Sequence, residues 1–131
     1  MMHIQIADEG TELAGLRLLV VEDDYLVAAD MCASLRRRGA AIMGPVANAR
    51  RSRELVRRQR PDVALLDINL NGHLAFDLAH ELESEGIRTI FTTGYDVAFL
   101  PESLRDSPCL QKPVNLNALV HLIRENVQSA R

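Results

Sequence analysis

The sequence predicts an α/β fold, a doubly wound five-stranded parallel sheet with helices on both faces. The 131 residues are 47% hydrophobic and 25% charged, which is typical of one globular domain. Short apolar runs alternate five times with segments whose apolar residues recur at helical spacing. Strands that alternate with helices pair in parallel, and helices then cover both faces of the sheet.

The first two strand–helix units follow from apolar runs and capping residues. Residues 16–24 form a nearly continuous apolar run that ends on three acids, as expected for a strand buried on both faces. Residues 25–38 carry apolar side chains at helical spacing and end in arginines. The second strand is expected at residues 40–47. Asn48 is expected to cap a helix that runs to about Arg60.

The next two strands are expected at residues 63–67 and 87–93. The first of them ends on Asp67, and residues 68–72 are interpreted as the loop that follows. Apolar spacing from Leu74 onward predicts a helix that ends near residue 86. The strand that ends on Asp67 is expected at the centre of the sheet, and the strand at 87–93 ends on two threonines.

The last third of the chain has a weaker pattern before its final unit. Residues 96–107 are expected to hold a short helix that Pro101 interrupts. A brief strand that ends at Lys112 is expected from residue 109, and the final helix is expected over residues 116–127. Residues 1–15 show no sustained period and are interpreted as an N-terminal extension to a domain over residues 16–131.

Composition excludes several classes of function. The net charge of −3 argues against a dedicated nucleic-acid binder, and no apolar run approaches the length of a membrane span. The first residues do not resemble a signal peptide, so we expect a cytoplasmic protein in which Cys32 and Cys109 are free thiols. The histidines have no zinc-binding spacing.

Polar residues stand where the predicted strands end. The carboxyl ends of parallel strands meet at one edge of the sheet, which is where α/β proteins bind their ligands. The residues expected at this edge are Glu22, Asp23, Asp24, Asp67, Thr92, Thr93 and Lys112. Lys112 is the only lysine among fifteen basic residues, which draws attention to its position.

These side chains suit phosphoryl chemistry at a hard cation. Neighbouring carboxylates repel one another unless a cation neutralises them, and oxygen ligands suit Mg²⁺. Asp67 stands alone at the end of a central strand, so it is the best candidate for a nucleophile that forms an aspartyl phosphate. Glu22 and Asp23 are candidates for the metal site. A purely structural role also remains open for each acid, because acids at strand ends often cap the next helix, as Asp24 could do.

Four motifs together resemble the receiver domain of two-component response regulators. They are V-V-E-D-D at 20–24, L-L-D-I-N-L-N-G at 65–72, F-T-T-G-Y at 91–95 and Q-K-P at 111–113. The resemblance covers residue 16 to about residue 128. It implies a CheY-like, flavodoxin-like sheet of strand order 2-1-3-4-5.

The resemblance also implies roles for individual residues. Asp67 would be the phosphoacceptor and Glu22 and Asp23 the acidic pair that holds Mg²⁺. Asn69 would offer its backbone carbonyl to the metal. Thr93 would be the switch residue. Lys112 would be the lysine of the site, followed by a cis bond to Pro113.

One position departs from the family pattern. Receiver domains usually carry Tyr or Phe three residues before the lysine, and this chain has Cys109 there. A thiol cannot sweep an aromatic ring between two positions, so the usual coupling of Thr93 to an aromatic switch is in doubt. Tyr95, two residues after Thr93, is a candidate substitute.

The resemblance implies a phosphorylated signalling domain rather than an enzyme with a diffusible product. Its phosphodonor would be a sensor histidine kinase, of the HWE type or a related type, or a phosphotransferase. We expect no DNA-binding output domain unless the chain is a fragment, so the output would be binding to another protein, and a homodimer is conceivable. The alternatives are a phosphorylation-independent interaction module, which Cys109 favours, and an aspartyl-nucleophile phosphohydrolase. A nucleotide-binding fold is disfavoured because the sequence has neither a G-x-G-x-x-G motif nor a P-loop.

Overall fold

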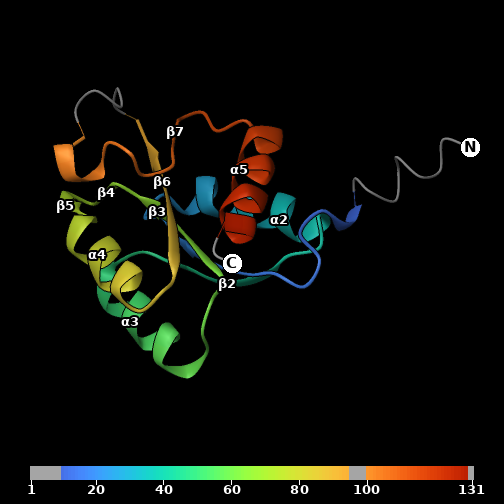
Figure 1. Cartoon of the computed structure of the whole chain (residues 1–131), viewed down its shortest axis with the longest axis horizontal. Helices are drawn as coiled ribbons and strands as arrows, with labels where there is room; N and C mark the ends of the chain where they lie inside the picture. The colour runs from blue at the N-terminus through green and yellow to red at the C-terminus, as the bar shows by residue number, and fades with distance from the viewer. Residues whose placement is uncertain (1–9, 95–99, 130–131) are drawn as a thin grey trace, which may run out of the picture.

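A computed structural model describes residues 10–94 and 100–129 and confirms the predicted fold (Figure 1). Five parallel strands form one sheet in the order β2-β1-β3-β6-β7, which is the order 2-1-3-4-5 when the five are counted along the chain. The strands are β1 (Arg17–Val21), β2 (Ala41–Val46), β3 (Val63–Asp67), β6 (Arg88–Thr93) and β7 (Cys109–Gln111). The helices are α2 (Tyr25–Arg37), α3 (Ala49–Arg58), α4 (Phe76–Ser84) and α5 (Leu116–Ser129).

The sheet separates two hydrophobic cores. Helices α3 and α4 cover one face, and helices α2 and α5 cover the other (Figure 1). The apolar side chains of each pair pack against the sheet in a core of their own. All five residues of β3 are buried, because this central strand is covered on both faces. Burial on both faces explains why the sequence reads as a continuous apolar run there rather than as alternation.

Two predicted helix caps are confirmed. The Asp24 side chain accepts hydrogen bonds from the backbone N–H groups of Leu26 and Val27, and the Asn48 side chain accepts one from Arg51. These bonds satisfy N–H groups that have no partner inside a helix. The chain therefore turns sharply from strand to helix directly above the carboxyl edge of the sheet.

The segment after β3 differs from the predicted loop and helix. Residues 69–74 form a hairpin of two short antiparallel strands, β4 (Asn69–Leu70) and β5 (His73–Leu74). Leu74 was predicted to face the core as part of a helix, but it lies in β5 and is 59% exposed. The helix α4 begins two residues later, because the pairing in the hairpin fixes the backbone of Leu74 in an extended conformation.

In the described part of the weakly predicted helix at 96–107, which is residues 100–107, the structure has one 3₁₀ turn, η2 (Glu102–Leu104), which follows Pro101. Residues 95–99 lie outside the described residues. The bond between Lys112 and Pro113 is cis, as the family resemblance implied. Within the described ranges, no helix is long and apolar enough to cross a membrane.

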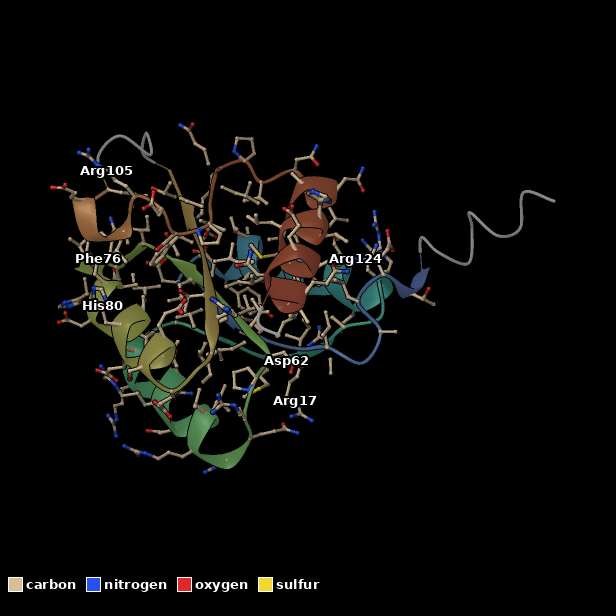
Figure 2. All side chains as sticks on the ribbon, viewed as in Figure 1. Arg17, Asp62, Phe76, His80, Arg105 and Arg124 are labelled. Atoms are coloured by element: carbon tan, nitrogen blue, oxygen red, sulfur yellow. The ribbon has the colours of Figure 1, made fainter. Side chains whose placement is uncertain are left out.

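Residues before β1 join the fold at the amino edge of the sheet. The side chain of Leu13 is fully buried in the core between the sheet and helices α2 and α5, and its N–H donates to the carbonyl of Arg38 (2.9 Å). At the same edge, the Arg17 N–H donates to the Asp62 carboxylate (2.8 Å), and Figure 2 shows these two residues side by side.

Candidate functional site

The carboxyl edge of the sheet holds a polar pocket of about 600 Å³. The residues that line it come from the ends of β1 and β3, the hairpin, and the segments after β6 and β7. They are Glu22, Asp23, Asp24, Asp67, Asn69, Asn71, Gly72, Gly94 and Lys112. Residues up to 90 positions apart in the sequence therefore meet here, as the parallel sheet predicted.

Lys112 connects two carboxylates inside this pocket. Its Nζ donates to Oε1 of Glu22 at 2.7 Å and to Oδ2 of Asp67 at 3.0 Å. Both carboxylate side chains are at least nine-tenths buried, whereas the Lys112 side chain is 25% exposed. The ammonium group therefore reaches in from the pocket opening to two acids that water barely contacts.

Burial and mutual repulsion shape the protonation of this group. Burial raises the pKa of Glu22, and the neighbouring Asp67 carboxylate raises it further, while the hydrogen bonds from Lys112 and from the Asp24 N–H oppose the rise. Burial lowers the pKa of Lys112, but the hydrogen bonds and charges of Glu22 and Asp67 outweigh it, so the net shift is upward. The pKa of Glu22 therefore rises mainly through burial, and the pKa of Lys112 rises through its two carboxylate neighbours.

The donor set fits a divalent cation. Glu22, Asp23 and Asp67 each place a carboxylate oxygen so that all three atoms lie within 4.8 Å of one another. Three carboxylates and one ammonium group leave two negative charges, which equals the charge that one divalent ion would supply. A cluster of oxygen ligands, partly exposed through Asp23, is the kind of site that hard cations occupy while keeping some of their waters.

Asp67 is held from two sides. The N–H of Asn69 donates to Oδ1 at 3.1 Å, and Lys112 donates to Oδ2 at 3.0 Å. Its side chain keeps 8% exposure at the floor of the pocket. The carboxylate is thus oriented and reachable, as a nucleophile requires.

Thr93 and Cys109, two of the predicted switch residues, are not among the described residues that line the pocket. Thr93 ends β6 beside the site, but its side chain is buried, and the next residue, Gly94, lines the pocket. Lys112 is tied to this strand because its N–H donates to the carbonyl of Thr93 (2.7 Å). Cys109 is half-buried against the core that includes Phe91, and burial raises the pKa of its thiol. Tyr95 lies outside the described residues.

Two features of the site were missed from the sequence. Asn71 and Gly72 line the pocket from the hairpin, although the Asn-Gly pair is a strong signal for a two-residue hairpin turn. An apolar groove of about 860 Å³ also adjoins the site between α2 and α5, and Lys112 lines both hollows. At its rim, Leu26 is 77% exposed, which helical spacing alone did not reveal.

Comparison with family models identifies the protein family of this chain. The family model described as the response regulator receiver domain matches residues 18–124. The chain belongs to this family. The receiver domain is the phosphorylated signalling module of two-component systems, and receiver domains bind a divalent metal at such an acidic pocket.

Among curated relatives, the receiver domain is 29% identical over 119 residues to the transcriptional regulatory protein PdtaR of Mycobacterium tuberculosis. The match covers 88% of this chain and 58% of PdtaR, so the chain spans a little over half the length of that relative.

Solved structures share the fold. The BeF₃-activated conformation of SdrG from Pseudomonas melonis Fr1 is 27% identical, with a TM-score of 0.76, over 87% of this chain and 98% of SdrG. A response regulator from Burkholderia pseudomallei, solved with a phosphorylated aspartic acid and a calcium ion, is 21% identical. Its TM-score is 0.75, with 87% of this chain and 69% of that chain covered, and it shows the fold alone.

Proposed function

We propose that this receiver domain accepts a phosphoryl group on Asp67 and switches its binding to another protein. The observation that carries the proposal is the placement of the Asp67 carboxylate in a pocket shared with Lys112 and two further acids. The activated state of SdrG, which is 27% identical to this chain, supports it. The phosphodonor would be a histidine kinase or a phosphotransferase.

The transfer follows from the positions of these groups. An Asp67 oxygen attacks the phosphorus atom of a phosphohistidine, a P–O bond forms, and the P–N bond breaks to release the imidazole. Lys112 stabilises the negative charge on the transferring group. Glu22, Asp23, Asp67 and the Asn69 carbonyl would hold Mg²⁺, which supplies charge neutralisation for the phosphoryl oxygens. The domain promotes its own modification and releases no new small-molecule product of its own.

A phosphodonor assay tests the proposal directly. We expect acetyl phosphate and Mg²⁺ to add one phosphoryl group to the wild-type chain, measured by intact mass. Asp67→Asn should abolish the adduct because it removes the nucleophile, whereas the exposed-site control Asp106→Asn should retain it. Loss of the adduct in both variants, or in neither, would contradict the assignment of Asp67.

The same assay, together with a turnover assay on a phosphomonoester, separates the alternatives. Cys109 in place of an aromatic residue favours an interaction module that keeps the fold without switching, and such a module would take up no phosphoryl group. A phosphohydrolase would turn over a phosphomonoester many times. The structure offers little support for the hydrolase, because Asn69, two positions after Asp67, cannot act as a general acid.

The apolar groove between α2 and α5 is the surface on which we place the protein donor. It adjoins Lys112, and exposed Tyr25 (75%) and Leu26 (77%) stand at the start of α2 beside the pocket. The test uses a histidine kinase that phosphorylates the wild-type chain. We expect Leu26→Asp to lower the rate of transfer from this kinase by about tenfold, because it puts a charge into an apolar contact. Labelling by acetyl phosphate should be unchanged. Equal slowing with both donors would contradict this placement.

A further inference from the structure

The hairpin that follows Asp67 is built around a two-residue turn. Asn69 pairs with Leu74 and Leu70 pairs with His73, which leaves Asn71 and Gly72 as the connection. Both have positive φ angles, 54° for Asn71 and 89° for Gly72. Positive φ at both central residues is the signature of a type I′ turn, which matches the twist of the strands it connects.

This turn is connected to Asp67 through Asn69. The N–H of Gly72 donates to the side-chain Oδ1 of Asn69 at 2.8 Å, and the N–H of Asn69 donates to Asp67 at 3.1 Å. The base of the hairpin is closed by the bond from the Ala75 N–H to the Ile68 carbonyl (2.8 Å). The position of Gly72 therefore fixes Asn69, and Asn69 in turn holds one oxygen of the phosphoacceptor.

We propose that the Asn71–Gly72 turn is a positioning element of the phosphoacceptor site, which acts through Asn69 on cation affinity and on the reactivity of Asp67. The inference rests on the proposed function and assigns a role to residues outside the reacting groups. It also assigns a role to the Asn69 side chain, in addition to the role of the Asn69 backbone carbonyl, because its Oδ1 anchors the turn.

The conformation of Gly72 makes the inference testable. A Cβ built at Gly72 would meet no heavy atom within 4 Å, so Gly72→Ala introduces no clash. Its effect would come only from the backbone, because alanine disfavours a φ of +89°. Asparagine tolerates this region better than other residues do, so Gly72→Asn should retain most of the turn geometry.

Gly15 provides a matched control in the same chain. It has a φ of +83°, and a Cβ there would also meet nothing within 4 Å. It precedes β1, at the edge of the sheet opposite the pocket. Gly15→Ala therefore introduces nearly the same backbone strain at a place from which it cannot reach Asp67.

We would measure three properties of each variant: Mg²⁺ affinity by calorimetry, the rate of labelling by acetyl phosphate, and the melting temperature. For Gly72→Ala we expect Mg²⁺ affinity to fall by about tenfold, since the strain of an alanine at this φ is relieved by moving the turn. Labelling should slow in parallel. Asn69→Ala, which removes the Oδ1 anchor but keeps the backbone groups, should lose affinity in the same direction.

The controls define what would overturn the inference. Gly15→Ala should match the melting temperature of Gly72→Ala but keep wild-type Mg²⁺ affinity, and Gly72→Asn should recover most of the affinity. Wild-type affinity and labelling in Gly72→Ala, or an equal loss in Gly15→Ala, would refute a positioning role. A wild-type chain that binds Mg²⁺ but forms no adduct would instead refute the proposed function and leave the affinity comparison valid.

Discussion

Replacing Lys112 with methionine will slow the labelling of Asp67 by acetyl phosphate by about 10²- to 10³-fold, the usual cost of removing one group that stabilises charge in a transition state. Lys112 Nζ lies 3.0 Å from Oδ2 of Asp67, so it reaches the oxygen region where the phosphoryl group would be attached. Methionine keeps an unbranched apolar side chain and removes the charge. Time-resolved intact mass at saturating Mg²⁺ measures the effect.

The same substitution should have the opposite effect on cation binding. Glu22, Asp23 and Asp67 each have a carboxylate oxygen within 4.8 Å of the other two. Without the ammonium group, no residue that lines the pocket carries a positive charge. We expect Mg²⁺ to bind about tenfold more tightly, because the repulsion between Lys112 and the ion disappears. A variant that merely disturbs the structure would weaken both properties together.

The control for this experiment is an exposed cation elsewhere. Arg36→Met makes the same change in net charge at the end of α2, away from the pocket, and should alter neither labelling nor Mg²⁺ affinity. If Lys112→Met labels at the wild-type rate, Lys112 does not stabilise the transferring phosphoryl group. If it binds Mg²⁺ more weakly, the ammonium group does not compete with the cation for Glu22 and Asp67.

The sheet and the acidic edge could be predicted because they depend on simple regularities. Buried strands such as β3 appear as short apolar runs, and parallel pairing brings their carboxyl ends together whatever the loops do. Asp67 and Lys112 could therefore be placed at one edge from their positions alone. The caps at Asp24 and Asn48 were equally local, since each side chain bonds to N–H groups two or three residues away.

The features that could not be predicted depend on three-dimensional context. Leu74 fits a helical period, but pairing in the hairpin moves it out to solvent. Thr93 ends β6 at the predicted edge, but its burial depends on packing between strands and helices that no local pattern encodes. The exposure of Leu26 depends on where α2 sits relative to α5, which no local pattern encodes.

The N-terminal segment provides the second large expected effect. Hydrophobic pattern places the start of the domain at Leu16, because the residues before it show no period. Nevertheless Leu13 is fully buried and packs with the core between the sheet and helices α2 and α5. Its backbone is fixed by the bond to the Arg38 carbonyl, and the adjacent Glu12 carboxylate accepts from the Arg38 guanidinium at 2.7 Å.

We expect Leu13→Ala to lower the free energy of unfolding by about 2–5 kcal/mol, the range for truncating a fully buried leucine, because it leaves a cavity as well as losing apolar burial. Urea unfolding followed by circular dichroism measures the change. Leu26→Ala, at a leucine that is 77% exposed, is the matched control and should stay within about 0.5 kcal/mol of wild type. Equal stabilities for the two variants would mean that Leu13 does not pack in the core, and that the cooperative domain begins at β1.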